Sequence, residues 1–132
     1  MDWKKEYALR CKDKELTKDL IMDSIKKLKK ELITTFNKYD VKFKMDISNE
    51  SVIINERVIE LNFQSDEFSF YYHRDIDIEI SPEKHAQLCL NGEKYEYKLT
   101  RSDKKKNVED EVYFLDDAID RIFQFLLSNN DD

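Results

Sequence analysis

The sequence VKFKMDISNESVIINERVIELNF, residues 41–63, decides the fold because its apolar residues follow a two-residue period. In residues 41–47 apolar side chains alternate with Lys and Asp, which is the pattern of a strand with one buried face. Residues 48–51 have the composition of a turn. Residues 52–54 and 58–63 predict further strand, with Asn55-Glu56 as either a tight turn between two strands or a bulge in one. This stretch therefore predicts antiparallel strands with short connections.

The alternation continues towards the C-terminus. Residues 68–73 and 75–80 alternate apolar and polar side chains, and they predict two further strands or one bent strand. Ser81-Pro82 ends this run, because proline cannot donate to a sheet ladder. Asn91-Gly92 lies between residues 86–90 and 93–100, and it predicts a hairpin with a type I′ turn, in which both central residues have positive φ. Residues 41–100 therefore predict an antiparallel meander.

Helical spacing flanks the strands on both sides. Residues from about 14 to 38 place apolar side chains at three- and four-residue steps, which predicts a long amphipathic helix. After a polar linker at residues 101–107, steps of four and three predict a second helix from about residue 109 to 127, with Glu109, Asp110 and Glu111 in its first turn. Residues 1–13 are predicted as an N-terminal arm, either a short helix or a segment packed across the domain, and residues 128–132 as a frayed tail.

These elements predict one α+β domain over residues 1–132, with a long N-terminal helix, an antiparallel β-meander of about five to seven strands and a C-terminal helix. Each helix has one apolar stripe and each strand has one apolar row. We therefore expect both helices to pack on one sheet face. The other face is left for solvent or for a partner.

Composition excludes several classes of protein. The chain has one glycine and one proline, whereas a P-loop needs two glycines and a dinucleotide-binding turn needs three. Its longest apolar run, residues 112–115, is far shorter than the roughly 20 residues that cross a bilayer, and no signal-peptide core is recognisable. The two cysteines, Cys11 and Cys89, do not form a disulfide framework. We therefore expect a cytoplasmic protein with reduced thiols, no membrane contact and no cofactor.

Charge is distributed unevenly along the chain. Residues 1–44 hold 13 Lys and Arg against 8 Asp and Glu, whereas residues 45–132 hold 10 against 21. The acidic part favours a basic partner. The basic part contains the cluster Lys26, Lys27, Lys29 and Lys30 on the predicted first helix, which a nucleic-acid-associated protein would use to contact phosphates. This cluster contains no Arg, so it is a weaker signal for base recognition.

The candidate binding residues lie on the predicted free face of the sheet. They are Tyr71, His73, Asp75, Asp77, Glu79 and Glu96. The alternating acids of residues 75–79, taken with Glu96-Tyr97-Lys98, loosely resemble the metal-binding acids and lysine of some nucleases, but an acid two places before a lysine occurs four times, about as often as chance predicts for this composition. The two histidines lack zinc-site spacing, and no oxyanion loop accompanies His85 and Cys89. We therefore expect no catalytic residue and no metal site.

The leading functional hypothesis is a non-catalytic interaction protein, of inhibitor, immunity or adaptor type, whose acidic open sheet face docks on another protein with a basic surface. One alternative is a small-molecule sequestering or hydrolytic protein with a pocket between sheet and helices. Its aromatic lining would come from Phe43, Phe63, Phe68, Phe70, Tyr95 and Tyr97. Another is a nucleic-acid-associated protein that uses the Lys-rich first helix. The open ends of a meander also allow a homodimer through an edge strand.

Overall fold

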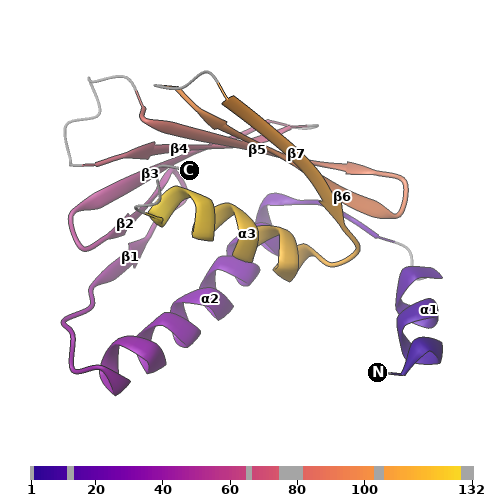
Figure 1. Ribbon diagram of the computed structural model, residues 1–132, viewed down its shortest axis with the longest axis horizontal. Helices are drawn as coiled ribbons and strands as arrows, with labels where there is room; N and C mark the ends of the chain where they lie inside the picture. The colour runs from indigo at the N-terminus through magenta and orange to yellow at the C-terminus, as the bar shows by residue number, and fades with distance from the viewer. Residues whose placement is uncertain (1, 12–13, 65–66, 75–81, 103–105, 129–132) are drawn as a thin grey trace.

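The computed structural model describes residues 2–11, 14–64, 67–74, 82–102 and 106–128. Within these residues the helices are α1 (Trp3–Cys11), α2 (Lys18–Lys38) and α3 (Leu115–Leu127), and the strands are β1 (Met45–Ile47), β2 (Ser51–Ile54), β3 (Arg57–Phe63), β4 (Phe68–His73), β5 (Lys84–Asn91), β6 (Lys94–Arg101) and β7 (Lys106–Val112). The strands form one sheet, with α2 and α3 on the same side of it and α1 set apart from it (Figure 1). The predicted α+β class is confirmed.

The sheet is a meander in which each strand pairs antiparallel with the next, in the order β1 to β7. Asn55 and Glu56 form a tight turn with φ values of 47° and 75°, so the tight-turn alternative is right and the bulge is wrong. The β5–β6 hairpin is confirmed, but its turn residues are Gly92 and Glu93, one position later than predicted, because Asn91 pairs with Lys94. Only Gly92 of this turn has a positive φ, of 63°.

The predicted boundary between strands and C-terminal helix is wrong. Residues 106–112 form β7, which pairs with β6 along its whole length, and α3 begins at Leu115. The acids predicted for the first helical turn therefore lie on β7, and Asp116 and Asp117 occupy the first turn instead. The first strand is also shorter than the predicted 41–47, because only Met45–Ile47 pair with β2. The strand predicted at residues 75–80 lies outside the described residues.

Helix α2 begins after Thr17, whose side chain accepts a hydrogen bond from the Leu20 backbone N–H at 3.2 Å. The segment before it is attached through Lys14, whose Nζ donates to the carbonyls of Glu93 and Tyr113, and through the Tyr95 hydroxyl, which donates to the Glu15 carbonyl. Helix α1 itself has no buried residue. No helix in the described part of the chain is long and apolar enough to cross a membrane.

The apolar faces of sheet, α2 and α3 form one core cluster, which confirms that both helices cover the same sheet face. Phe70 of β4 contacts Phe123 of α3 edge-on, with ring centroids 6.3 Å apart. Lys84 adds a polar link, because its buried ammonium group donates to the carbonyls of Phe125 and Ser128 at the C-terminal end of α3. A cation at this end of a helix also interacts favourably with the helix dipole.

Burial in this core predicts that an Ile-to-Asp substitution lowers the free energy of unfolding much more at a buried position than at an exposed one. Ile119→Asp places a charge at a side chain that is 1% exposed, whereas Ile33→Asp changes a side chain that is 37% exposed. The first should lower the free energy of unfolding by about 4 kcal/mol or more, and the second by about 1 kcal/mol or less. Urea denaturation of both variants measures the difference. Equal losses would contradict the position of α3.

The link from Lys84 to α3 is tested by Lys84→Met, which keeps the length of the side chain and removes its donors. Two carbonyls at the end of α3 then lose a partner, and the free energy of unfolding should fall by about 1–3 kcal/mol. Lys98→Met is the matched control on the next strand, because Lys98 is half exposed and its ion pair with Glu109 is long, at 4.0 Å. Thermal unfolding should show a clearly smaller loss for the control, and a reversed order would contradict this account of Lys84.

Candidate partner-binding face

The side chains opposite the core form a helix-free face. Strand alternation and register place on it Val58, Glu60 and Asn62 of β3, Tyr71 and His73 of β4, His85, Gln87 and Cys89 of β5, Lys94, Glu96 and Lys98 of β6, and Asn107, Glu109 and Glu111 of β7. Sequence alternation identified these members from β3 to β6 except His85. It missed those of β7, because Asn107 was predicted in a linker and Glu109 and Glu111 in a helix.

The candidate residues of the sequence analysis fall into two groups. Tyr71 and His73 lie together on β4, and Tyr71 pairs with His85. Glu96 pairs with Cys89, which lies four residues beyond His85 on β5. At the rise of a strand, His85 and Cys89 are about 13 Å apart. The structure therefore does not bring Glu96 together with the other two. Asp75, Asp77 and Glu79 lie outside the described residues.

His73 is buried and bonded to Glu60 of the neighbouring strand. Its side chain is 4% exposed, whereas that of Glu60 is 40% exposed. A partner approaching this point would therefore meet the carboxylate of Glu60 rather than the imidazole.

Tyr71 and His85 form a flat stack, with ring centroids 4.6 Å apart and an interplanar angle of 3°. The Nε2 atom of His85 is buried and has no hydrogen-bond partner among the described residues. Burial lowers the pKa of His85, Glu67 opposes this and Lys98 adds to it, so the ring is neutral at pH 7. The stack presents apolar ring surface in the middle of a polar face.

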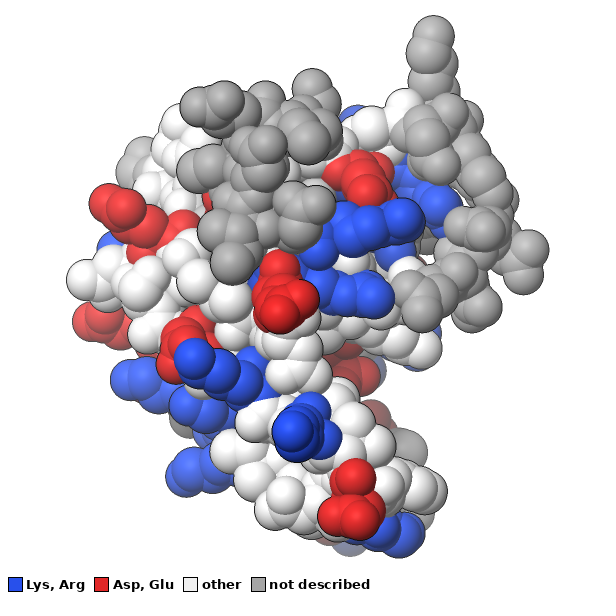
Figure 2. All heavy atoms as spheres, turned by 90° about the vertical axis from the view of Figure 1, so that its left-hand side faces the viewer, with Lys and Arg blue, Asp and Glu red and all other residues white. Residues whose placement is uncertain are grey.

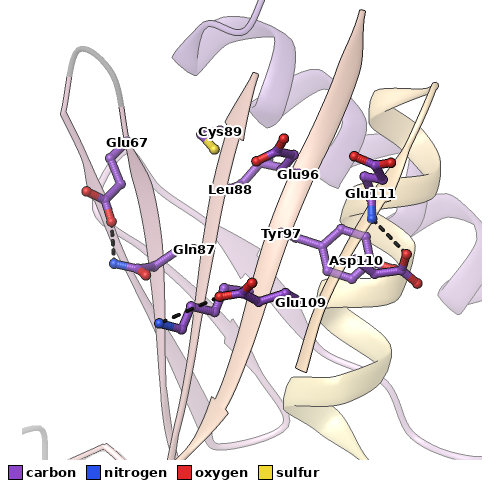
Figure 3. A pocket seen from close by; sticks show the side chains of 10 residues that line it. Glu67, Gln87, Leu88, Cys89, Glu96, Tyr97, Glu109, Asp110 and Glu111 are labelled. Carbon is purple, nitrogen blue, oxygen red and sulfur yellow. Dashed lines mark hydrogen bonds and ion pairs between the residues drawn. The ribbon is translucent and has the colours of Figure 1, made fainter. Parts of the chain in front are cut away.

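An acidic groove of about 740 Å³ crosses β5, β6 and β7 (Figure 3). Of the described residues, the acidic ones that line it are Glu67, Glu96, Glu109, Asp110 and Glu111, and the basic one is Lys98. Asp110 alternates with Glu109 and Glu111, so its side chain lies on the helix side of β7. Gln87 and Cys89 form its floor on β5. We call this hollow, together with the residues that line it, the acidic groove.

The carboxylates of the acidic groove are only partly neutralised. Lys94 pairs with Glu111 at 2.9 Å, and Lys98 approaches Glu109 at 4.0 Å. Glu67 accepts a hydrogen bond from the Gln87 amide, and Glu96 accepts one from the Asn91 amide at 2.7 Å. Among the described residues, neither Glu67 nor Glu96 has an ion pair.

The carboxylates of the acidic groove influence the pKa of the Cys89 thiol. Burial raises the pKa of the Cys89 thiol, and Glu96 and Glu67 raise it further. Both Cys89 and the exposed Cys11 are free thiols. Within the described ranges, no group of three or more His, Cys, Asp or Glu side chains is placed to hold a metal ion.

The residues of the two alternative hypotheses lie elsewhere. Of the aromatic side chains proposed to line a pocket, Phe68, Phe70, Tyr95 and Tyr97 are buried in the core, and Phe43 and Phe63 pack against it. The lysines of α2 lie on the helix side of the sheet, where Lys27 pairs with Asp116 at 3.3 Å. The end of the molecule seen in Figure 2 carries basic and acidic side chains interspersed, in contrast to the acidic groove.

The raised pKa of Cys89 predicts slow alkylation by iodoacetamide at pH 8, where the thiol form dominates. In a Cys11→Ser background, Glu67→Gln with Glu96→Gln should speed the reaction about two- to fivefold, because removing the carboxylates lowers the pKa and increases the thiolate fraction. Asp23→Asn with Glu31→Gln, two exposed positions on α2, is the charge-matched control and should leave the rate unchanged. An unchanged rate in the groove variant would contradict the assigned potential.

Comparison with known proteins adds no further assignment to this face. The chain matches no protein-family model, no curated protein and no solved structure. The residues of the helix-free face and their geometry are therefore the basis on which a function is proposed.

Proposed function

We propose that this protein is a non-catalytic docking module that binds a basic surface of another protein through its helix-free sheet face. The observation that carries the proposal is the acidic groove, where four glutamates and one lysine line the helix-free face in the described part of the chain. Glu67 and Glu96 are satisfied by amides rather than by cations. A Lys or Arg of a partner would supply the charge that these carboxylates lack.

The surroundings of the acidic groove suit docking. The Tyr71–His85 stack lies on the same face and offers aromatic surface, which is enriched in protein interfaces. The acidic excess of residues 45–132 would attract a basic partner before contact, and this attraction is screened beyond about 8 Å at physiological ionic strength. Binding would therefore be fast and sensitive to salt, and an inhibitor, immunity or adaptor protein would act by covering the basic surface of its target.

The proposal is tested with a fluorescent decalysine peptide as the probe. Glu67→Gln with Glu96→Gln removes two groove carboxylates on the helix-free face that have no ion pair with any described residue, and Asp23→Asn with Glu31→Gln removes the same charge from α2. At low salt the groove variant should bind about 5- to 30-fold more weakly than the wild type, since each lost charge contact is worth about 0.5–1 kcal/mol.

The α2 variant serves as the control for net charge in the same fluorescence titration. Its affinity for decalysine should stay close to that of the wild type, and raising the salt concentration should reduce the difference between the groove variant and the wild type. Equal weakening of both variants would show that the probe responds to net charge alone, and it would contradict docking at the acidic groove.

A further inference from the structure

Strand β7 is an open edge of the sheet, because it pairs with β6 on one side and with no strand on the other in the described part of the chain. The direction of its main-chain groups follows from the β5–β6 hairpin. Asn91 and Lys94 flank a two-residue turn, so they are a hydrogen-bonded pair, and the main-chain groups of Lys94 point towards β5. Alternation along β6 then points those of Tyr97 and Leu99 towards β7.

The register between β6 and β7 shows which main-chain groups of β7 point away from the sheet. Tyr97 pairs with Asp110 and Leu99 with Val108, so the main-chain groups of Asp110 and Val108 bond to β6. Those of Asn107, Glu109 and Glu111 therefore point away from the sheet. The N–H of Glu111 is already satisfied, because it donates to the Asp110 carboxylate at 2.8 Å. The N–H and C=O groups of Asn107 and Glu109 have no main-chain partner in the described ranges, so they can pair with a further strand.

The side chains at this edge are strongly acidic. Glu109 and Glu111 lie on the helix-free face and line the acidic groove, and Asp110 lies between them on the helix side. A second copy of β7, paired antiparallel with this edge, would set these acids against the same acids. Like charges directly opposite each other destabilise a strand pair, so the edge disfavours a homodimer and favours a basic strand.

The two sides of β7 differ in chemistry. On the helix-free side an added strand would lie beside the acidic groove of about 740 Å³. On the helix side it would meet Val108, which is 47% exposed, and a hollow of about 290 Å³ between β6, β7 and α3. An added strand therefore fits best when basic residues alternate with apolar residues of moderate size.

Building on the proposed function, we propose that an extended basic segment of the partner protein adds antiparallel to β7 as an eighth strand. Its Lys or Arg residues lie opposite Asn107, Glu109 and Glu111 and project over the acidic groove. Its apolar residues project to the helix side beside Val108. The antiparallel direction matches every other pair in this sheet, and such pairs are slightly more stable per residue than parallel ones.

The probe for this proposal is the peptide KVKVKVK, capped at both ends, in two forms that differ only in the place of two backbone N-methyl groups. In an antiparallel pair, the N–H groups of peptide lysines opposite Glu109 bond to β7, and those of the valines point to solvent. Methylation of two inner lysine nitrogens should therefore weaken binding at least about tenfold, whereas methylation of two valine nitrogens should have little effect. Both forms carry the same charge.

A second test changes the protein instead of the peptide. Asn107→Pro removes one outward N–H without removing a bond to β6, and Asn107→Ala is the matched control with no change in charge. The unmodified KVKVKVK peptide should bind the Pro variant about fivefold more weakly and the Ala variant as tightly as the wild type. The thermal unfolding midpoints of both variants show whether the fold is retained.

The outcomes separate this proposal from the one on which it rests. Equal affinity of the two methylated peptides would overturn strand addition, even if decalysine still binds the groove variant more weakly than the wild type. Selective loss with the valine-methylated form would overturn the antiparallel direction. Should Asn107→Pro fail to fold, the methylated peptides on the wild-type protein still decide the question.

Discussion

The apolar face of the sheet is buried against α2 and α3, and the contact between Phe70 and Phe123 is part of that interface. Because side chains alternate along a strand, each residue that turns to the helices sends its neighbours to the other side. Burial of Phe68, Phe70 and Tyr72 thus places Tyr71 and His73 on the helix-free face. The same constraint acts along β5, β6 and β7, so the acidic groove is a consequence of one-sided packing combined with an acidic sequence.

The period-two alternation of residues 41–100 was sufficient to predict the meander and, for the described candidates Tyr71, His73 and Glu96, the face on which the side chain lies. It could not locate the end of the sheet. Val108 and Val112 are four residues apart, and this spacing places two side chains on the same face of a helix and on the same face of a strand. Backbone pairing with β6 decides between the two, and this pairing is not visible in the spacing of the apolar residues of β7. The next step, of three residues from Val112 to Leu115, does distinguish the two structures. Side chains three residues apart lie on opposite faces of a strand but on one face of a helix.

The same ambiguity limited the prediction of the candidate site. Glu96 and Tyr71 were placed on the correct face from local alternation, but their separation depends on the register of β4 and β5. Glu109 and Glu111 were missed because they were predicted on a helix, where their acidity has an ordinary explanation as first-turn charge. Glu67 belongs to the groove through the turn between β3 and β4, and nothing in its own neighbourhood indicates that it faces Gln87.

An acidic edge strand can pair with a strand of another protein and still disfavour pairing with a second copy of itself. An edge with free N–H and C=O groups can pair with any extended chain, including its own copy. Acids on β7 oppose self-pairing through like-charge repulsion, and the same acids favour a strand of opposite charge. In the proposed strand addition, side chains would give the edge its specificity, whereas main-chain hydrogen bonds would give attachment that is independent of sequence. The ion pair of Lys94 with Glu111 moderates the repulsion within the chain and leaves the edge negative for a partner.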